Sequence, residues 1–420
     1  LGSERLHDRP VYAVLHLADL YRDRKMTSVS RLDWKKVPAV LNGSWPQPVP
    51  QPLVLDGTND DHMEDYFDEA SRTDYLALDT EFTPDNLLTL IGLGWRAGTE
   101  THGLQLNWLH GNATTRTRRR FIQRLRDVVS RGQPRIVFHN ALADIPVLRE
   151  SLSIVVPWEY IDDTMLADAC LWPELPHDLG FLASRYSKHT KLKHLAKEDQ
   201  LAYNWGDVLA TLDSWEALKA GLATDCGASS DYRGQRLPLL PIIQEAHDHG
   251  IQVNQQRVEA ALQEYRSRCD EAARLTAAWC GWPINPGSEQ QLKAWLYGVD
   301  GLPPQTNRAS KSKVSVDDDA IAALRQRYSL PFDPDDEERH PPTVDTAMDR
   351  VLAGGHGVLE GRAIYARSKQ LTAHYLEPLA GRARVYPRTA IHTQANGRWS
   401  TTEPPLAQLP ESLRDIIQPD

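Results

Sequence analysis

The sequence predicts an α/β domain built on a mixed β-sheet, followed by a mostly helical region. Apolar stretches at 75–80, 88–95 and 103–107 are joined by short connections, which predicts antiparallel neighbouring strands. A helical pattern at 114–131 then precedes a strand at 135–139, so a crossover should add a parallel neighbour. From residue 229 the apolar pattern is helical, which predicts a second region of different structure.

The composition is that of an ordinary soluble globular protein. The chain has 420 residues, 41% hydrophobic and 25% charged, enough for two or three domains. Its net charge of −10 argues against nucleic-acid binding through overall positive charge but is compatible with a local basic groove. Its four cysteines contain no Cys-x-x-Cys pair, so neither a zinc site nor a disulfide framework is predicted. No apolar run approaches the ~20 residues that span a bilayer, so no membrane association is expected.

Acidic residues follow two of the predicted strands. Asp79 lies near the end of the strand at 75–80 and Glu81 directly follows it, and side chains two apart on an extended strand point to the same face. Asp144 lies in the first turn of the helix after strand 135–139, close to Asn140. An isolated Asp-Thr-Glu is common in surface turns, so the functional interpretation depends on the motifs that follow.

A third acidic motif lies on a predicted helix, where Tyr203 and Asp207 are four residues apart and share a face. Four carboxylates can hold two hard divalent ions through oxygen ligands. Such a pair supports in-line displacement at a phosphodiester, because one ion activates the attacking water and the other neutralises the leaving oxygen. Tyr203 is suited to orient that water.

These motifs resemble those of a known family. Asp79-Thr-Glu81, Asn140-x-x-x-Asp144 and Tyr203-x-x-x-Asp207 are similar to the three exonuclease motifs of the DEDD proofreading nucleases, tyrosine subtype. Asp163-Thr-Met-Leu and His177-Asp-Leu-Gly-Phe-Leu-Ala resemble segments of the proofreading domain of bacterial DNA polymerase I and its phage relatives; Ala143 departs from the usual aromatic residue. The resemblance implies an RNase H-like fold and a 3′–5′ exonuclease with two Mg²⁺ or Mn²⁺ ions, ligated by Asp79, Glu81, Asp144 and Asp207, with Tyr203 positioning water.

The second half resembles the thumb and the start of the palm of family A DNA polymerases. The segment from Tyr386 to Pro410 is similar to the signature that begins the palm, in which the arginine equivalent to Arg398 contacts the primer backbone. The resemblance stops at Asp420, before the polymerase metal site. We therefore expect polymerase activity only of a full-length protein, with palm and fingers on the rest of a longer chain or on a second polypeptide. The expected DNA contacts are Asn140, Phe82, Arg398, Arg388 and Lys369.

Three regions are predicted. Residues 1–50 hold a segment around His16 that is faintly similar to the tail of a uracil-DNA glycosylase, and a proline-rich linker; residues 51–228 form the exonuclease domain; residues 229–420 form the thumb and an incomplete palm. The expected partners are single-stranded 3′ ends of DNA and primer-template, bound by a monomer in the cytoplasm of a bacterial cell, from a bacterial or phage gene. The alternatives are a free-standing exoribonuclease of RNase D type and a DNA-binding scaffold with an inactive nuclease.

Several residues have plainer interpretations. The arginines between 116 and 126 are expected on a solvated helix face in preference to a phosphate site, because nothing ties them to the carboxylates. His139 and His177 are expected to pack or cap, and Trp205 and Trp215 to lie in the core. Replacing Asp144 by alanine is expected to leave stability unchanged or slightly raised, since the site should be a solvent-facing cluster of like charges.

Overall fold

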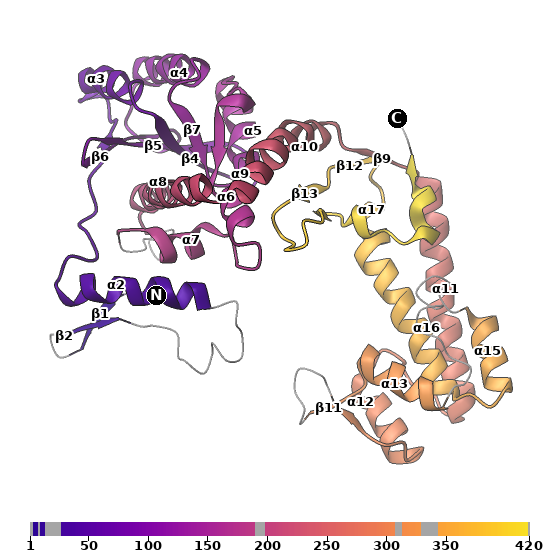
Figure 1. Cartoon of the computed structure of the whole chain (residues 1–420). Helices are drawn as coiled ribbons and strands as arrows, with labels where there is room; N and C mark the ends of the chain where they lie inside the picture. The colour runs from indigo at the N-terminus through magenta and orange to yellow at the C-terminus, as the bar shows by residue number, and fades with distance from the viewer. Residues whose placement is uncertain are drawn as a thin grey trace. The chain divides into compact units, whose positions relative to one another are not determined.

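The computed structural model describes residues 3–6, 9–12, 27–189, 198–306, 313–328 and 343–418. The chain divides into two compact units. Figure 1 shows the chain coloured by residue number. The first unit comprises Leu1–Glu245 with Ala390–Trp399, and the second comprises Ala246–Thr389 with Ser400–Asp420.

A six-stranded mixed sheet forms the centre of the first unit, in the order β3-β6-β5-β4-β7-β8. Neighbours β4, β5 and β6 pair antiparallel, whereas β7 and β8 continue the sheet in parallel from β4. The predicted mixed α/β sheet is thereby confirmed. The strands are β3 (Leu53–Val54), β4 (Tyr75–Phe82), β5 (Leu88–Ala97), β6 (Glu100–Asn107), β7 (Arg135–Phe138) and β8 (Ile161–Asp163).

Helices cover both faces of this sheet (Figure 1). Successive side chains of β4 point to opposite faces of the sheet. Leu76 and Leu78 join the large core cluster on one face, whereas Ala77 packs against α8 (Gln200–Thr224) on the other. Outside the sheet, β1 (Ser3–Leu6) and β2 (Arg9–Tyr12) form a hairpin. The helices are α2 (Thr27–Leu41), α3 (Asp60–Ala70), α4 (Thr115–Ser130), α5 (Ala141–Leu152), α6 (Thr164–Leu171), α7 (Leu179–Tyr186), α8 (Gln200–Thr224), α9 (Cys226–Asp231) and α10 (Leu237–His249), which crosses into the second unit.

Glycines let α8 lie close against the sheet. A Cβ atom added at Gly92 would lie 2.2 Å from Asn204 Oδ1, and one at Gly103 would lie 2.1 Å from the Trp205 ring. Such distances are far inside van der Waals contact, so only glycine fits at these positions. Trp205 and Trp215 are buried, as predicted.

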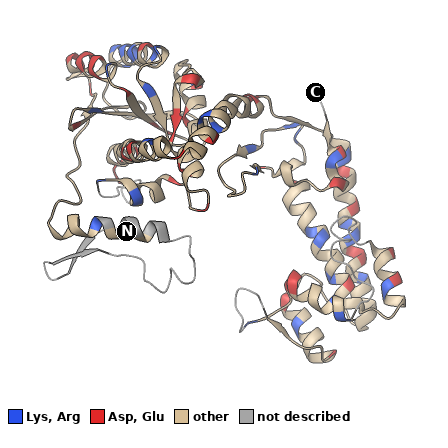
Figure 2. Cartoon of the chain, viewed as in Figure 1, with Lys and Arg blue, Asp and Glu red and all other residues tan. Residues whose placement is uncertain are grey.

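Two arginines of α4 pair with acidic residues of α3, and Figure 2 shows the two helices with opposite charge. Arg120 lies 2.8 Å from Glu64, and Arg124 lies 2.9 Å from the same carboxylate and also pairs with Asp68. These two arginines join neighbouring helices, so their charge is already matched within the domain. This pairing disfavours the phosphate-binding alternative for both residues.

The proline-rich stretch after α2 is part of the first unit and is hydrogen-bonded to other parts of it. Gln47 N donates to Lys188 O at 2.8 Å, and Trp205 Nε1 donates to Pro50 O at 2.6 Å. Lys36 of α2 also donates to Ser184 O at 2.7 Å. The stretch is therefore held against the unit. His16, around which the glycosylase similarity was noted, lies outside the described residues.

The second unit is mostly helical, as predicted. Asn254 caps the long helix α11 and Ser288 caps α12, while Gly250 has a positive φ of 69° where α10 ends. The helices are α11 (Gln255–Cys280), α12 (Glu289–Lys293), α13 (Asp318–Tyr328), α15 (Val344–Leu352), α16 (Gly357–Leu371) and α17 (Glu377–Leu379). Short strands are β9 (Ile251–Val253), β10 (Gln305–Thr306), β11 (Val314–Ser315), β12 (Arg384–Val385), β13 (Arg388–Ala390), β14 (Ser400–Thr402) and β15 (Ile417–Gln418).

Within the described part of the chain, no helix is both long and apolar enough to cross a membrane. All four cysteines are free thiols.

Candidate active site

Strand β4 delivers two carboxylates to the face of the sheet that α8 covers. Asp79 pairs with Gly92 of β5, and Glu81 pairs with Leu90. The register then shifts between Glu81 and Phe82, a bulge of the kind that ends pairing beside functional sites. Both side chains are half-buried, so they stay accessible at the end of the strand.

Helix α8 brings Tyr203 and Asp207 to the same place. Asp79, Glu81 and Asp207 each offer a carboxylate oxygen within 4.8 Å of the other two. The Tyr203 hydroxyl hydrogen-bonds Asp207, one helical turn away. Three of the four predicted carboxylates therefore form one cluster, with the tyrosine beside it.

Asp144 approaches this cluster from α5, on the opposite face of the sheet. Its Oδ1 accepts hydrogen bonds from Thr80 N at 2.9 Å and Thr80 Oγ1 at 2.6 Å. Only 4% of its surface is exposed. The expectation of a solvent-facing Asp144 is wrong, because Thr80 points away from Asp79 and Glu81 and binds this carboxylate inside the domain. The expectation that its removal leaves stability unchanged or slightly raised thereby loses its premise, because this carboxylate accepts two buried hydrogen bonds.

Burial and mutual repulsion disfavour the charged forms of Asp79, Glu81 and Tyr203. Desolvation, followed by Asp144, Asp207 and Glu81, raises the pKa of Asp79 well above its ordinary value. Desolvation with Asp207 and Asp144 raises the pKa of Glu81 to about 7. The same surroundings raise the pKa of Tyr203, so its hydroxyl stays protonated at neutral pH. A cation between these carboxylates would relieve the repulsion.

Two polar residues beside Asp79 carried no motif in the sequence. Asn204 Nδ2 donates to Asp79 Oδ2 at 2.7 Å, and Gln105 Nε2 donates to Asn204 Oδ1 at 2.8 Å. Asn204 follows Tyr203 directly, and no signal in a single sequence separates it from other helical asparagines. Only the pairing of β4, β5 and β6 shows that Gln105 lies near Asp79 and Asn204.

The other predicted contacts are distributed over both units. Asn140 precedes α5 with a left-handed φ of 69°, and Phe82 is 38% exposed just beyond Glu81. Arg398 is exposed in the first unit, whereas Lys369 and Arg388 are exposed in the second, where Arg388 pairs with Glu403 at 3.3 Å.

The two histidines pack, as predicted. His177 is buried, with its Nδ1 2.8 Å from Asp168 Oδ2, and His139 Nδ1 lies 2.9 Å from Thr164 Oγ1. Burial lowers the pKa of His139 to about 3. Neither histidine has a contact with the carboxylate cluster among those the structure describes.

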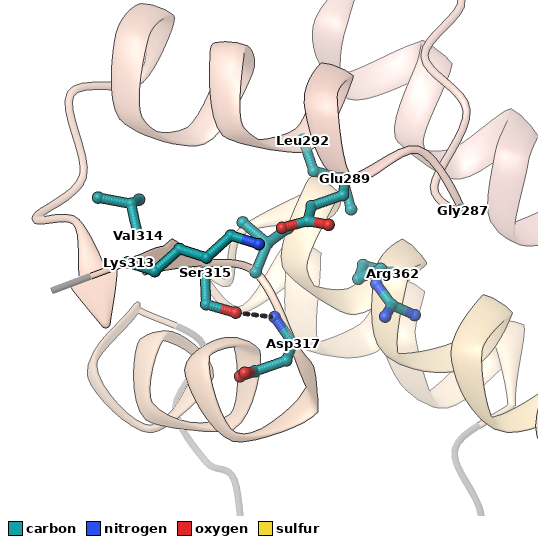
Figure 3. A pocket seen from close by; sticks show the side chains of 9 residues that line it. Gly287, Glu289, Leu292, Lys313, Val314, Ser315, Asp317 and Arg362 are labelled. Atoms are coloured by element: carbon teal, nitrogen blue, oxygen red, sulfur yellow. Dashed lines mark hydrogen bonds between the residues drawn. The ribbon is translucent and has the colours of Figure 1, made fainter. Parts of the chain in front are cut away.

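A separate pocket of about 280 Å³ lies in the second unit (Figure 3). Lys313, Glu289, Asp317 and Arg362 are among its lining residues, and Asp317 N donates to Ser315 Oγ at 3.0 Å. It contains none of the carboxylates described above, and its own opposite charges give it no net preference for anions or cations.

Comparison with known proteins assigns the first unit. Residues 57–222 match the family model described as 3′–5′ exonuclease. No curated protein matches the chain. Among solved structures, the polymerase domain of Pol1 from M. smegmatis, in complex with DNA primer-template and dNTP, matches with a TM-score of 0.61 and 20% identity. The match covers 87% of this chain and 57% of that one, so the chain spans little more than half the length of its structural relative.

Residues 57–222 of the first unit therefore form a nuclease domain of the 3′–5′ exonuclease class. Over most of its length the chain also shares the fold of a DNA polymerase domain.

Proposed function

We propose that this chain hydrolyses the 3′-terminal phosphodiester of DNA with the help of two divalent ions. The observation that carries the proposal is the convergence of the Asp79, Glu81 and Asp207 oxygens within 4.8 Å of one another, with Asp144 beside them. These donors are all carboxylate oxygens, the ligands that suit Mg²⁺ and Mn²⁺. Ligand oxygens around one such ion lie up to about 4 Å apart, so the cluster fits after small adjustments.

The proposed roles follow from the contacts of each side chain. Asp79, Glu81 and Asp207 hold the first ion, and Asp144 contributes to the second through the oxygen that Thr80 leaves free. Bound there, the ions would activate the attacking water and stabilise the leaving oxygen. The Tyr203 hydroxyl, held by Asp207 and kept protonated, orients the water toward the scissile phosphate.

The chain's outer residues then select the substrate. Phe82, exposed next to Glu81, stacks on the terminal base, and Asn140 contacts the terminal nucleotide at the start of α5. The exposed cations Arg398, Arg388 and Lys369 bind phosphates of single-stranded or primer-template DNA. As part of a DNA polymerase, this activity would remove misincorporated nucleotides during DNA synthesis.

The test is digestion of 5′-labelled single-stranded DNA and of the matching RNA, in Mg²⁺, in Mn²⁺ and in chelator. We expect a ladder that shortens DNA from its 3′ end only when metal is present. A 3′-phosphorothioate end should slow the first step. Preference for RNA would favour an RNase D-type enzyme, and DNA binding without digestion would favour a scaffold.

A further inference from the structure

A relay of hydrogen bonds runs from the backbone of α8, through two buried amides, to the carboxylate of Asp79. Gln105 Nε2 donates to Leu201 O at 2.9 Å and to Asn204 Oδ1 at 2.8 Å. Asn204 Nδ2 then donates to Asp79 Oδ2 at 2.7 Å. Gln105 is 1% exposed and Asn204 is fully buried, so water does not compete for these bonds.

The backbone carbonyl fixes the direction of the whole relay. A carbonyl oxygen only accepts, so the Gln105 atom that faces Leu201 is its amide nitrogen. That nitrogen only donates, so Asn204 faces it with Oδ1. The amide nitrogen of Asn204 is left to point at Asp79, and the amide cannot rotate by half a turn without losing two buried bonds.

The register of the sheet places the residues of this relay next to one another. Asp79, Gly92 and Gln105 are paired side by side across β4, β5 and β6. The missing side chain at Gly92 leaves the space that Asn204 fills, since a Cβ there would lie 2.2 Å from Asn204 Oδ1. Asn204 Nδ2 also donates to Asp79 O at 3.3 Å. Three strands and one helix thus hold this amide nitrogen against Asp79, with Oδ2 as its only carboxylate acceptor.

We propose that Asn204 is a positioning residue for metal binding, oriented by Gln105, and that it holds Asp79 so that Oδ1 is the oxygen offered to the ion. This inference rests on the proposed function. Ligating carboxylates are commonly held by such hydrogen bonds, whose loss weakens metal affinity about 10-fold to 100-fold. Asn204 acts through Asp79 and does not itself touch substrate.

The experiment measures Mn²⁺ binding by electron paramagnetic resonance on the full chain, together with the Mn²⁺ dependence of digestion. Asn204→Ala should weaken Mn²⁺ binding about 10-fold and raise the half-saturating Mn²⁺ concentration, with most of kcat recovered at saturation. Gln105→Ala should have a smaller effect of the same kind, although its side chain touches no carboxylate. The double variant should bind about as weakly as Asn204→Ala, because the two residues act in series.

Thr211→Val is the matched control, since Thr211 lies buried on the same helix with no hydrogen bond from its hydroxyl. It should bind Mn²⁺ like the wild type. Mn²⁺ affinity in Asn204→Ala equal to that of the wild type or of Thr211→Val would overturn the inference while leaving the proposed function standing. A wild-type protein that neither binds Mn²⁺ nor digests DNA would overturn the proposed function and this inference together. Should Asn204→Ala fail to fold, wild-type affinity in Gln105→Ala would overturn the inference.

Discussion

Replacing Glu81 by glutamine should change how the stability of the metal-free protein depends on pH. The pKa of Glu81 is raised from 4.5 to about 7 by desolvation and by Asp207 and Asp144. A raised pKa means that the folded protein keeps this proton at pH values where the unfolded chain has lost it. The wild type therefore loses stability as pH rises from about 4.5 to about 7, and the loss is complete above that range. Glutamine cannot ionise, so the variant escapes this loss.

The size of the effect follows from the shift. A rise from 4.5 to about 7 corresponds to about 3.4 kcal/mol at ~1.36 kcal/mol per pH unit. Glu81 is only partly buried, and solvent screens the repulsion, so we expect about 1 to 2 kcal/mol. This gain should be absent at pH 4 and fully present at pH 8.

The assay is urea unfolding in chelator at pH 4, 5, 6, 7 and 8, for the wild type, Glu81→Gln and Glu174→Gln. Glu174 is an exposed glutamate of the same unit, so its variant should differ from the wild type by a constant amount. Adding Mg²⁺ at pH 8 should stabilise the wild type more than Glu81→Gln, because only the wild type keeps the full ligand set. A difference in free energy of unfolding between Glu81→Gln and the wild type that does not vary with pH would show that folding does not raise the pKa of Glu81.

Three further substitutions test the roles of Asp144, Tyr203 and Gly92. Asp144→Ala should abolish digestion and lower the free energy of unfolding by about 1 to 3 kcal/mol, because two Thr80 donors lose their buried acceptor; a stability equal to the wild type's in thermal unfolding would contradict this. Tyr203→Phe should reduce turnover while Mn²⁺ affinity stays near that of the wild type, whereas Asp207→Ala should lose both; equal losses of affinity would give Tyr203 a structural role. Gly92→Ala should destabilise the protein by about 1 to 3 kcal/mol, since its methyl group would overlap Asn204; unchanged urea unfolding would show that α8 can move away.

Much of the first unit could be predicted from the sequence because its signals are local. Strand β4 and helix α4 follow from alternation and helical spacing, and their predicted ends lie within two residues of those observed. Strands β3 and β8 were missed. These strands have only two and three residues. Two of the three residues of β8 are Asp162 and Asp163, which are buried in the fold although charged residues are not typical of a buried strand.

The carboxylates themselves could be found because their residue types and spacing carry chemistry. Their surroundings could not. The bonds from Thr80 to Asp144 join residues 64 positions apart, and Gln105 and Asn204 are 99 apart. Such contacts depend on strand register and on how closely a helix approaches, neither of which is encoded in a short motif. The pairing of Arg120 with Glu64 is of the same kind, since only the packing of α4 on α3 brings them together.

The number of Mn²⁺ ions that the protein binds in the presence of a nucleoside 5′-monophosphate, the expected product of digestion, tests whether the four carboxylates hold two ions. Product phosphate completes the coordination that protein carboxylates begin, so both sites should then be filled. Titration followed by electron paramagnetic resonance should give about two ions per chain for the wild type and about one for Asp144→Ala. A wild-type protein that trims DNA in Mn²⁺ with a single bound ion, or an Asp144→Ala variant that keeps both ions, would contradict the assignment of two ions to these four carboxylates.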